Sequence, residues 1–141
     1  MAVLLDTNVV SELLRPSPNP TVERWVAGHE AADLCFSAVG EAELRYGVAL
    51  LRAGRRRDAL AGAVEAILRE DFEDRLLPFD SRAAREYANI AASRRIAGRP
   101  VAPGNCQIAA IARSRGLTVA TRNVRDFADM EIELVDPWAK P

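Results

Sequence analysis

Three acidic side chains follow segments that can bring them to one place in a fold. Asp6 comes directly after the apolar run 3–5, Glu43 lies in the segment that follows the apolar run 34–37, and Asp126 follows the apolar run 117–121. Carboxylates that share a site repel each other, by about 4 kcal/mol for a pair ~4 Å apart at an effective dielectric constant of roughly 20. A hard cation would neutralise such a cluster.

The cation that suits this donor set is Mg²⁺ or Mn²⁺, which prefers oxygen ligands and keeps several waters for phosphate substrates. A metal bound in this way can polarise a phosphoryl oxygen and supply a hydroxide nucleophile. The three carboxylates therefore indicate metal-assisted hydrolysis of a phosphodiester. His29 is the only histidine, which excludes a zinc site built from several histidines.

The elements that position these acids follow from the hydrophobic pattern, with glycine and proline at the breaks. Short apolar runs predict five strands, at 3–5, 34–37, 76–79, 117–121 and 132–135. Helical spacing and capping signals predict helices from 7 or 8 to about 14, from 20, at about 39–51 and 55–70, from 80 or 81 to near 98, and from 103 to 116. Strands separated by helices imply crossover connections and a mostly parallel sheet of four to five strands, covered on both faces. We expect one α/β domain over residues 1–141.

Ligands of an open parallel sheet bind beyond the carboxyl ends of its strands, where Asp6 and Asp126 are both expected. The simplest alternative is that Asp6 only caps the following helix. Thr7 and Asn8 are better placed as caps by type and position, and we therefore expect Asp6 to point into the crevice. Glu43 taken alone is typical of a solvated helix face.

Composition limits the class of protein. Apolar residues make up 49% of the 141 and charged residues 28%, which is typical of a soluble globular domain, and no apolar run approaches the roughly 20 residues of a membrane helix. The first residues lack a basic signal-peptide region. Cys35 and Cys106 form no disulfide framework, so we expect a reducing, cytoplasmic location and no membrane association.

Basic residues are unevenly distributed. Between Tyr87 and Arg125 the chain has no acid, and a second basic cluster comprises Arg52 and residues 55–57. These arginines fit either solvated helix faces or a surface for phosphates or an acidic partner segment, and composition leaves both open. Trp25 and Trp138 favour packing or dimer contacts over base stacking.

Other nucleotide-binding folds lose support from the same residues. The chain has no G-x-G-x-x-G or P-loop segment, so a dinucleotide or NTP site is not indicated. A receiver-like module would need paired acids after the first strand and a late lysine in the sheet. Here one acid follows that strand, and Lys140 is the only lysine.

Taken together, the motifs resemble the PIN-domain ribonucleases, specifically toxins of the VapC/FitB type in type II toxin–antitoxin systems. The matching segments, which span nearly the whole chain, are residues 4–8, 37–39, 42–47, 77–80, 107–112, 120–123, 126–127 and 136–138. The resemblance implies a PIN-like three-layer α/β/α fold. It also implies a Mg²⁺- or Mn²⁺-dependent endoribonuclease that leaves a 5′-phosphate and a 3′-hydroxyl.

The resemblance further implies roles for individual residues. Asp6 and Glu43 correspond to metal ligands and Asp126 to a further catalytic acid. Thr7, Asn8, Thr121 and Asn123 correspond to groups that line the site. The implied partners are an RNA substrate, a second copy of the chain in a homodimer, and a cognate VapB/FitA-type antitoxin. DNA would be bound only indirectly, through that antitoxin.

Two positions depart from the family pattern. Asn105 stands where the family places a third metal-binding aspartate, and no neighbouring acid can replace it. Asn123 stands where some members carry an aspartate, with Asp126 three residues on. Asparagine offers a metal a neutral oxygen without charge, so we predict weaker metal binding and water activation. Natural degeneration, a site that works with fewer acids and a deliberate substitution all account for Asn105.

Two functions follow from Asn105. The leading hypothesis is a toxin ribonuclease with activity reduced at this position. The alternative is a catalytically impaired PIN-fold binding module that dimerises, holds an antitoxin and acts in a repressor complex. A flavodoxin- or receiver-like module would need an FMN site or a phosphoacceptor pair, which the motifs do not supply.

Overall fold

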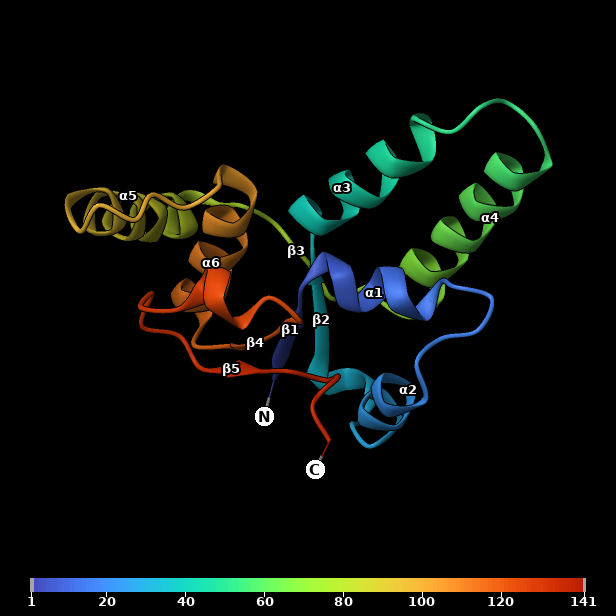
Figure 1. Cartoon of the computed structure of the whole chain (residues 1–141), viewed down its shortest axis with the longest axis horizontal. Helices are drawn as coiled ribbons and strands as arrows, with labels where there is room; N and C mark the ends of the chain where they lie inside the picture. Colours follow the sequence, from blue (N-terminus) through green and yellow to red (C-terminus); the bar gives the residue numbers. More distant parts are fainter. Residues whose placement is uncertain (1, 141) are drawn as a thin grey trace.

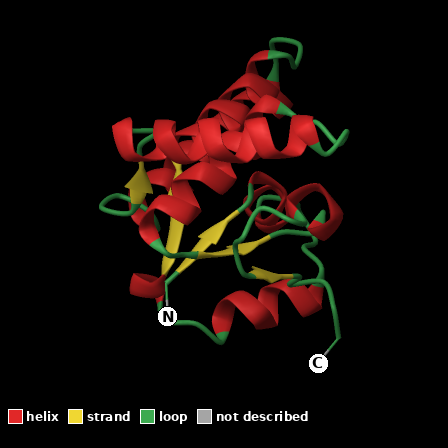
Figure 2. Cartoon of the chain, turned by 90° about the vertical axis from the view of Figure 1, so that its left-hand side faces the viewer, coloured by secondary structure: helices red, strands yellow, loops and turns green. Residues whose placement is uncertain are grey.

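A computed structural model of the chain describes residues 2–140 and shows a central parallel sheet with helices on both sides (Figures 1 and 2). The five strands lie in the order β3-β2-β1-β4-β5, and every pairing is parallel. Their bounds are β1 Val3–Leu5, β2 Leu34–Ser37, β3 Leu76–Leu77, β4 Thr118–Ala120 and β5 Leu134–Val135. The predicted mostly parallel α/β fold is confirmed.

Six α-helices within residues 2–140 cover the sheet. They are α1 Thr7–Leu13, α2 Pro20–Ala27, α3 Ala38–Ala49, α4 Arg55–Glu70, α5 Ser81–Ile96 and α6 Pro103–Arg115, with short 3₁₀ turns at Ala31–Asp33 and Val124–Phe127. In the described part of the chain no helix is long and apolar enough to cross a membrane. The predicted helix signals hold at Asn19 and Asp80, which cap α2 and α5, and at Gly116, which ends α6 in the left-handed region.

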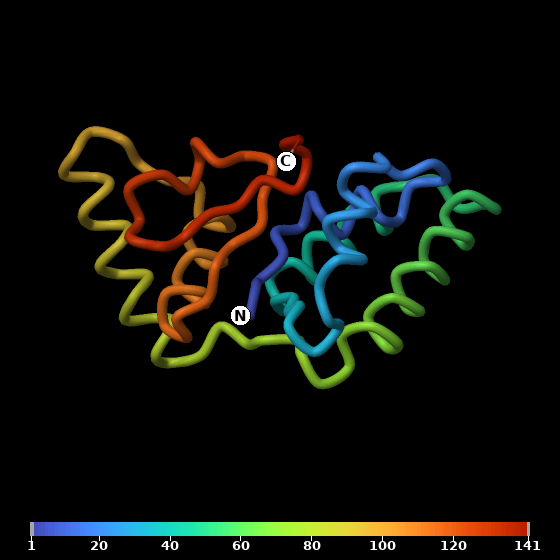
Figure 3. The backbone as a smooth tube through the Cα atoms, turned by 90° about the horizontal axis from the view of Figure 1, so that it is seen from below, coloured from blue at the N-terminus to red at the C-terminus, as the bar shows by residue number. Residues whose placement is uncertain are grey.

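Side chains alternate between two cores because successive residues of a strand point to opposite faces. In β1, Leu4 joins the core formed with α5 and α6, while Val3 and Leu5 join the core formed with α1–α4. Cys35 and its neighbours in β2 alternate in the same way. Figure 3 shows β1 between the N-terminal and C-terminal halves of the chain, which is the three-layer arrangement expected for a PIN-like domain.

The edge strands are shorter than the sequence predicts. β3 ends at Leu77 because Pro78 has no N–H to donate to the sheet. β5 begins only at Leu134 because Asp129 and Glu131 adopt positive φ angles of 62° and 57°, so the chain is still turning there. Neither difference moves the carboxyl ends of the central strands, where the predicted site lies.

Gly40 sets how closely α3 packs on the sheet. It lies in the first turn of α3, and a Cβ at this position would overlap the ring of Phe36, whose side chain is fully buried in β2. Any larger side chain would push α3 away from β2, and with it Glu43 one turn further on.

We predict that Gly40→Ala lowers the free energy of unfolding by about 1–3 kcal/mol, the usual cost of overpacking a core. Urea unfolding followed by circular dichroism measures the change. Gly62→Ala in α4 is the matched control, because open space surrounds that glycine and alanine favours a helix by up to about 1 kcal/mol. Equal effects of the two substitutions would contradict the close packing at Gly40.

Candidate active site

Asp6 is the centre of the predicted site and is nearly buried, with 5% of its surface exposed. It follows β1 directly, and its backbone N–H donates to the carbonyl oxygen of Ala120 in β4 (2.8 Å). One carboxylate oxygen accepts from the Thr7 backbone N–H (2.8 Å), and the other accepts from the Thr121 hydroxyl (2.8 Å). One oxygen is therefore held by the start of α1 and the other by the residue that follows β4.

The expectation that Thr7 or Asn8 would cap α1 is wrong. Asp6 is the N-cap residue, with extended backbone angles and a side chain that accepts from Thr7. The Asp6 carboxylate has two oxygens, so one can cap the helix while the other faces the end of β4. Capping and a place in the site are therefore compatible, and the prediction erred in treating them as alternatives.

Glu43 reaches the same place from α3. Its side chain is exposed, and its Oε1 accepts a hydrogen bond from the Thr7 hydroxyl (2.8 Å). The other oxygen of Glu43 faces Gly104 in the first turn of α6, where an added Cβ would lie 3.7 Å from it. Glu43 is thus tied to the residue beside Asp6 and lies against the start of α6.

The charges of the site act on Asp6. Burial raises the pKa of the Asp6 carboxyl above its ordinary value, and the negative charges of Glu43 and Asp126 raise it further. The hydrogen bonds from Thr121 and Thr7 act in the opposite direction without cancelling the rise in pKa. Asp6, Glu43 and Asp126 therefore lie close enough for Asp6 to feel the negative charge of the other two.

The residues after β4 form a polar turn around Thr121, which is fully buried. The Thr121 oxygen accepts from the backbone N–H of Asn123 (3.0 Å) and from the side-chain amide of Asn8 (3.5 Å). Asp126 lies in the 3₁₀ turn that follows, with its N–H donating to the carbonyl oxygen of Asn123 (2.9 Å). This turn brings Thr121, Asn123 and Asp126 to the sheet edge that Asp6 occupies, and Asn8 reaches it from α1.

Asn105 is half-buried in the first turn of α6, beside the Gly104 that faces Glu43. Within residues 2–140 its side chain makes no hydrogen bond. Also within this range, no three His, Cys, Asp or Glu side chains gather closely enough to hold a metal ion. The carboxylates at the site therefore supply part of a ligand shell only.

The sequence does not predict the contacts that hold these side chains in place. The hydrogen bond between Thr7 and Glu43 joins residues 36 positions apart, and no local pattern signals it. The close approach of Gly104 to Glu43 was also missed, although a glycine directly before the family's acidic position was a usable signal.

Comparison with known proteins shows the family of the chain. The PIN domain model matches residues 3–133. The chain belongs to the PIN domain family. The chain is 40% identical over 136 residues to the toxin FitB of Neisseria gonorrhoeae, and the match covers 96% of this chain and 98% of that protein. It is 35% identical over 136 residues to the VapC ribonuclease Y4jK of Sinorhizobium fredii, covering 96% and 97%.

A solved structure shows the same fold. The chain superposes on a chain of FitAB bound to the IR36 DNA fragment with a TM-score of 0.91 and 38% sequence identity. The match covers 99% of this chain and 97% of that chain. The predicted family resemblance and the predicted fold are therefore confirmed.

Burial of Asp6 predicts an effect on stability in the metal-free protein. Because the pKa of Asp6 is raised on folding, the native state holds its proton more tightly than the unfolded chain. The free energy of unfolding should therefore fall as pH rises from the ordinary pKa of 3.8 through the raised value. Asp6→Asn keeps a good N-cap and should be more stable than the original chain at pH 7 in the presence of a chelator.

Urea unfolding from pH 3 to pH 8 measures this difference, which should vanish below the ordinary pKa. Glu133→Gln is the control, because Glu133 is exposed and lies just before β5, away from the carboxyl ends of the strands. If Asp6→Asn instead loses stability relative to the original chain as the pH rises from 3 to 7, the pKa of Asp6 is not raised on folding.

Proposed function

We propose that this PIN domain is a metal-dependent endoribonuclease toxin that a cognate antitoxin neutralises. The observation that carries the proposal is the buried Asp6 carboxylate, held by hydrogen bonds and surrounded by the negative charge of Glu43 and Asp126. The similarity to the toxin FitB and to a VapC ribonuclease supports RNA as the substrate.

The donor set fits a hard divalent cation. Asp6 and Glu43 would hold Mg²⁺ or Mn²⁺, with Asn105 as a neutral third ligand and water completing the shell. The unbalanced negative charge that raises the pKa of Asp6 is what a cation would neutralise. When bound, the metal would polarise the phosphoryl oxygen and supply the hydroxide that attacks phosphorus, leaving a 5′-phosphate and a 3′-hydroxyl.

The chain's own residues fix the geometry of these ligands. Thr121 donates to one oxygen of Asp6, and Thr7 orients Glu43 by donating to its Oε1. Asn8 and Asn123 in turn contact Thr121, so the hydroxyl that holds Asp6 is itself held. We propose that Asp126 is a further acid at the rim of the site, where its negative charge acts on Asp6.

Asn105 supports a second candidate function. Its amide brings no charge to a site that has few carboxylates, so metal affinity should be lower than with aspartate at this position. A chain with too little metal affinity would act as a catalytically impaired binding module in a toxin–antitoxin repressor complex. The two candidates share the fold and the partner and differ in hydrolysis alone.

A groove beside the site offers a place for the antitoxin. It has a volume of about 540 Å³ and lies between α1, α3 and α4, and its lining includes Thr7 and Glu43 of the site together with Arg15 and Arg56. Its walls are mainly apolar, with Leu14, Leu44, Val48 and Leu60 among them. We propose that an amphipathic antitoxin segment fills this groove and brings a basic side chain to Glu43.

Other features support the remaining parts of the proposal. Tyr46 in α3 and Leu50, the residue that follows this helix, are 66% and 67% exposed, which favours a homodimer contact at this end of α3. Cys35 and Cys106 are free and buried, consistent with the cytoplasm. We further propose that DNA is reached only through the antitoxin and that residues 1–141 form one PIN-like domain.

We predict that Asn105→Asp raises Mn²⁺-dependent RNA cleavage at least about tenfold, because a third carboxylate would strengthen metal binding and water activation. Digestion of total RNA with and without Mn²⁺, resolved by gel electrophoresis, measures the change. Asn105→Ala is the control for loss of the amide oxygen and should be no more active than the original chain.

Adding Asp6→Ala to the Asn105→Asp chain should abolish the cleavage. If Asn105→Asp and the original chain are both inert and indistinguishable from Asp6→Ala, the ribonuclease proposal is wrong. High and equal activity in both would show that position 105 is not a required ligand.

A further inference from the structure

Most arginines in the acid-free window of the sequence form hydrogen bonds or ion pairs with other parts of the chain. Arg94 donates to backbone carbonyls of residues 99 and 128, and Arg99 pairs with Asp129. Arg113 and Arg115 also form ion pairs with acids of neighbouring elements. Three arginines of this window remain, namely Arg95, Arg122 and Arg125. Within residues 2–140 they form no ion pair and donate to no carbonyl.

Arg122 is the one of these three that directly follows Thr121 of the candidate active site. Its backbone N–H faces the Asn8 side-chain oxygen (3.5 Å), and its guanidinium carbon lies 5.2 Å from the centre of the Trp138 ring. The Arg122 side chain is therefore directed toward Trp138 in the C-terminal segment.

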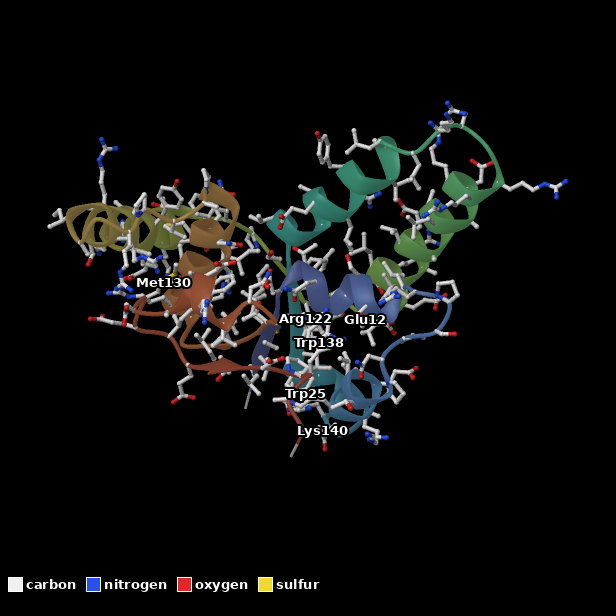
Figure 4. The ribbon with its side chains drawn as sticks, viewed as in Figure 1. Glu12, Trp25, Arg122, Met130, Trp138 and Lys140 are labelled. Carbon is white, nitrogen blue, oxygen red and sulfur yellow. The ribbon has the colours of Figure 1, made fainter. Side chains whose placement is uncertain are left out.

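A pocket lies further along this edge, between α2 and the segment that follows β5. Its volume is about 640 Å³, within the usual range for a small-molecule site, and it is lined by Arg24, Trp25 and Lys140. Figure 4 shows Arg122, Trp138, Trp25 and Lys140 in succession from the end of β4 downward. One wall is Val135, whose carbonyl accepts from the Thr121 N–H (2.9 Å).

Two hydrogen bonds through Thr121 therefore connect the pocket wall to Asp6, one from its backbone to Val135 and one from its hydroxyl to the carboxylate. Asp6 follows β1 and the pocket is lined by the end of β5, and β4 with Thr121 lies between these two strands. A chain-like ligand bound at Asp6 would need to extend over Arg122 and Trp138 to reach the pocket.

The charges and surfaces of the pocket fit a nucleotide. Arg24 and Lys140 are exposed cations, while the one acid in the lining, Asp136, already accepts from the Trp138 N–H (2.9 Å). Trp25 and Trp138 pack against the core but are only half-buried, so part of each ring faces outward. Cations beside partly exposed aromatic rings are the combination that binds single-stranded nucleic acid.

We propose that this pocket is an accessory RNA subsite that receives a nucleotide flanking the one cleaved at Asp6. Arg24 and Lys140 contact its phosphate, Trp25 contacts its base, and Arg122 on Trp138 contacts the phosphate between the two sites. The subsite rests on the proposed ribonuclease function and adds a path for the substrate to it.

The test is binding of a fluorescein-labelled, 12-nucleotide single-stranded RNA, measured by fluorescence anisotropy in a chelator so that no cleavage occurs. The double variant Arg24→Glu/Lys140→Glu should raise the Kd at least about tenfold. The slope of log Kd against log salt should become shallower by about 0.7 for each phosphate that the variant no longer binds. Arg95→Glu is the control, because Arg95 is exposed on α5 and forms no ion pair within residues 2–140, and it should change the Kd less than about twofold.

Photocrosslinking of the same RNA carrying 4-thiouridine gives a local readout, with peptides containing Trp25 or Trp138 expected among the products. A double variant that matches Arg95→Glu in Kd would overturn the subsite, even if Asn105→Asp cleaves RNA. RNA binding that depends on Arg24 and Lys140, without cleavage by any variant, would overturn the ribonuclease proposal and leave the subsite standing. Loss of protein-partner binding with an unchanged Kd for RNA would assign the pocket to that partner and overturn the RNA subsite.

Discussion

The hydrogen bond from the Thr121 hydroxyl to the Asp6 carboxylate joins two strand ends at the edge of the sheet where the candidate site lies. It exists because β1 and β4 pair in parallel, with Leu5 opposite Ala120, so the residues that follow each strand meet. A nearly buried carboxylate is costly unless it is hydrogen-bonded or neutralised. Here hydrogen bonds compensate part of that cost, and the nearby acids increase it.

Two cavities with no lining residue in common lie near Asp6, and the helices beside both pack on the same face of the sheet. In one, α1, α3 and α4 enclose an apolar groove that includes Glu43, and Arg122 leads toward the other, the pocket beside α2. We infer that an inhibiting segment and an RNA strand approach Asp6 from different directions. They would then compete only at the carboxylates themselves, so a segment that reaches Glu43 would stop cleavage without covering the whole RNA path.

The sequence was sufficient for the central strands and for most helix ends, because Pro20, Asp80 and Gly116 act through local backbone geometry. It predicted which residues gather at Asp6 only through the parallel topology and the family resemblance. The bond from Thr7 to Glu43 depends on how α3 packs on the sheet, which no local pattern encodes. The capping role of Asp6 was missed because one carboxylate can satisfy two partners.

Isothermal titration with Mn²⁺ measures whether Asp6 anchors a divalent-cation site. We expect saturable binding to the original chain, loss of at least about tenfold in affinity for Asp6→Asn, and tighter binding for Asn105→Asp. Glu133→Gln, at an exposed acid just before β5, should bind as the original chain does. Equal Mn²⁺ affinity in the original chain and in Asp6→Asn would show that Asp6 is not a ligand of the cation.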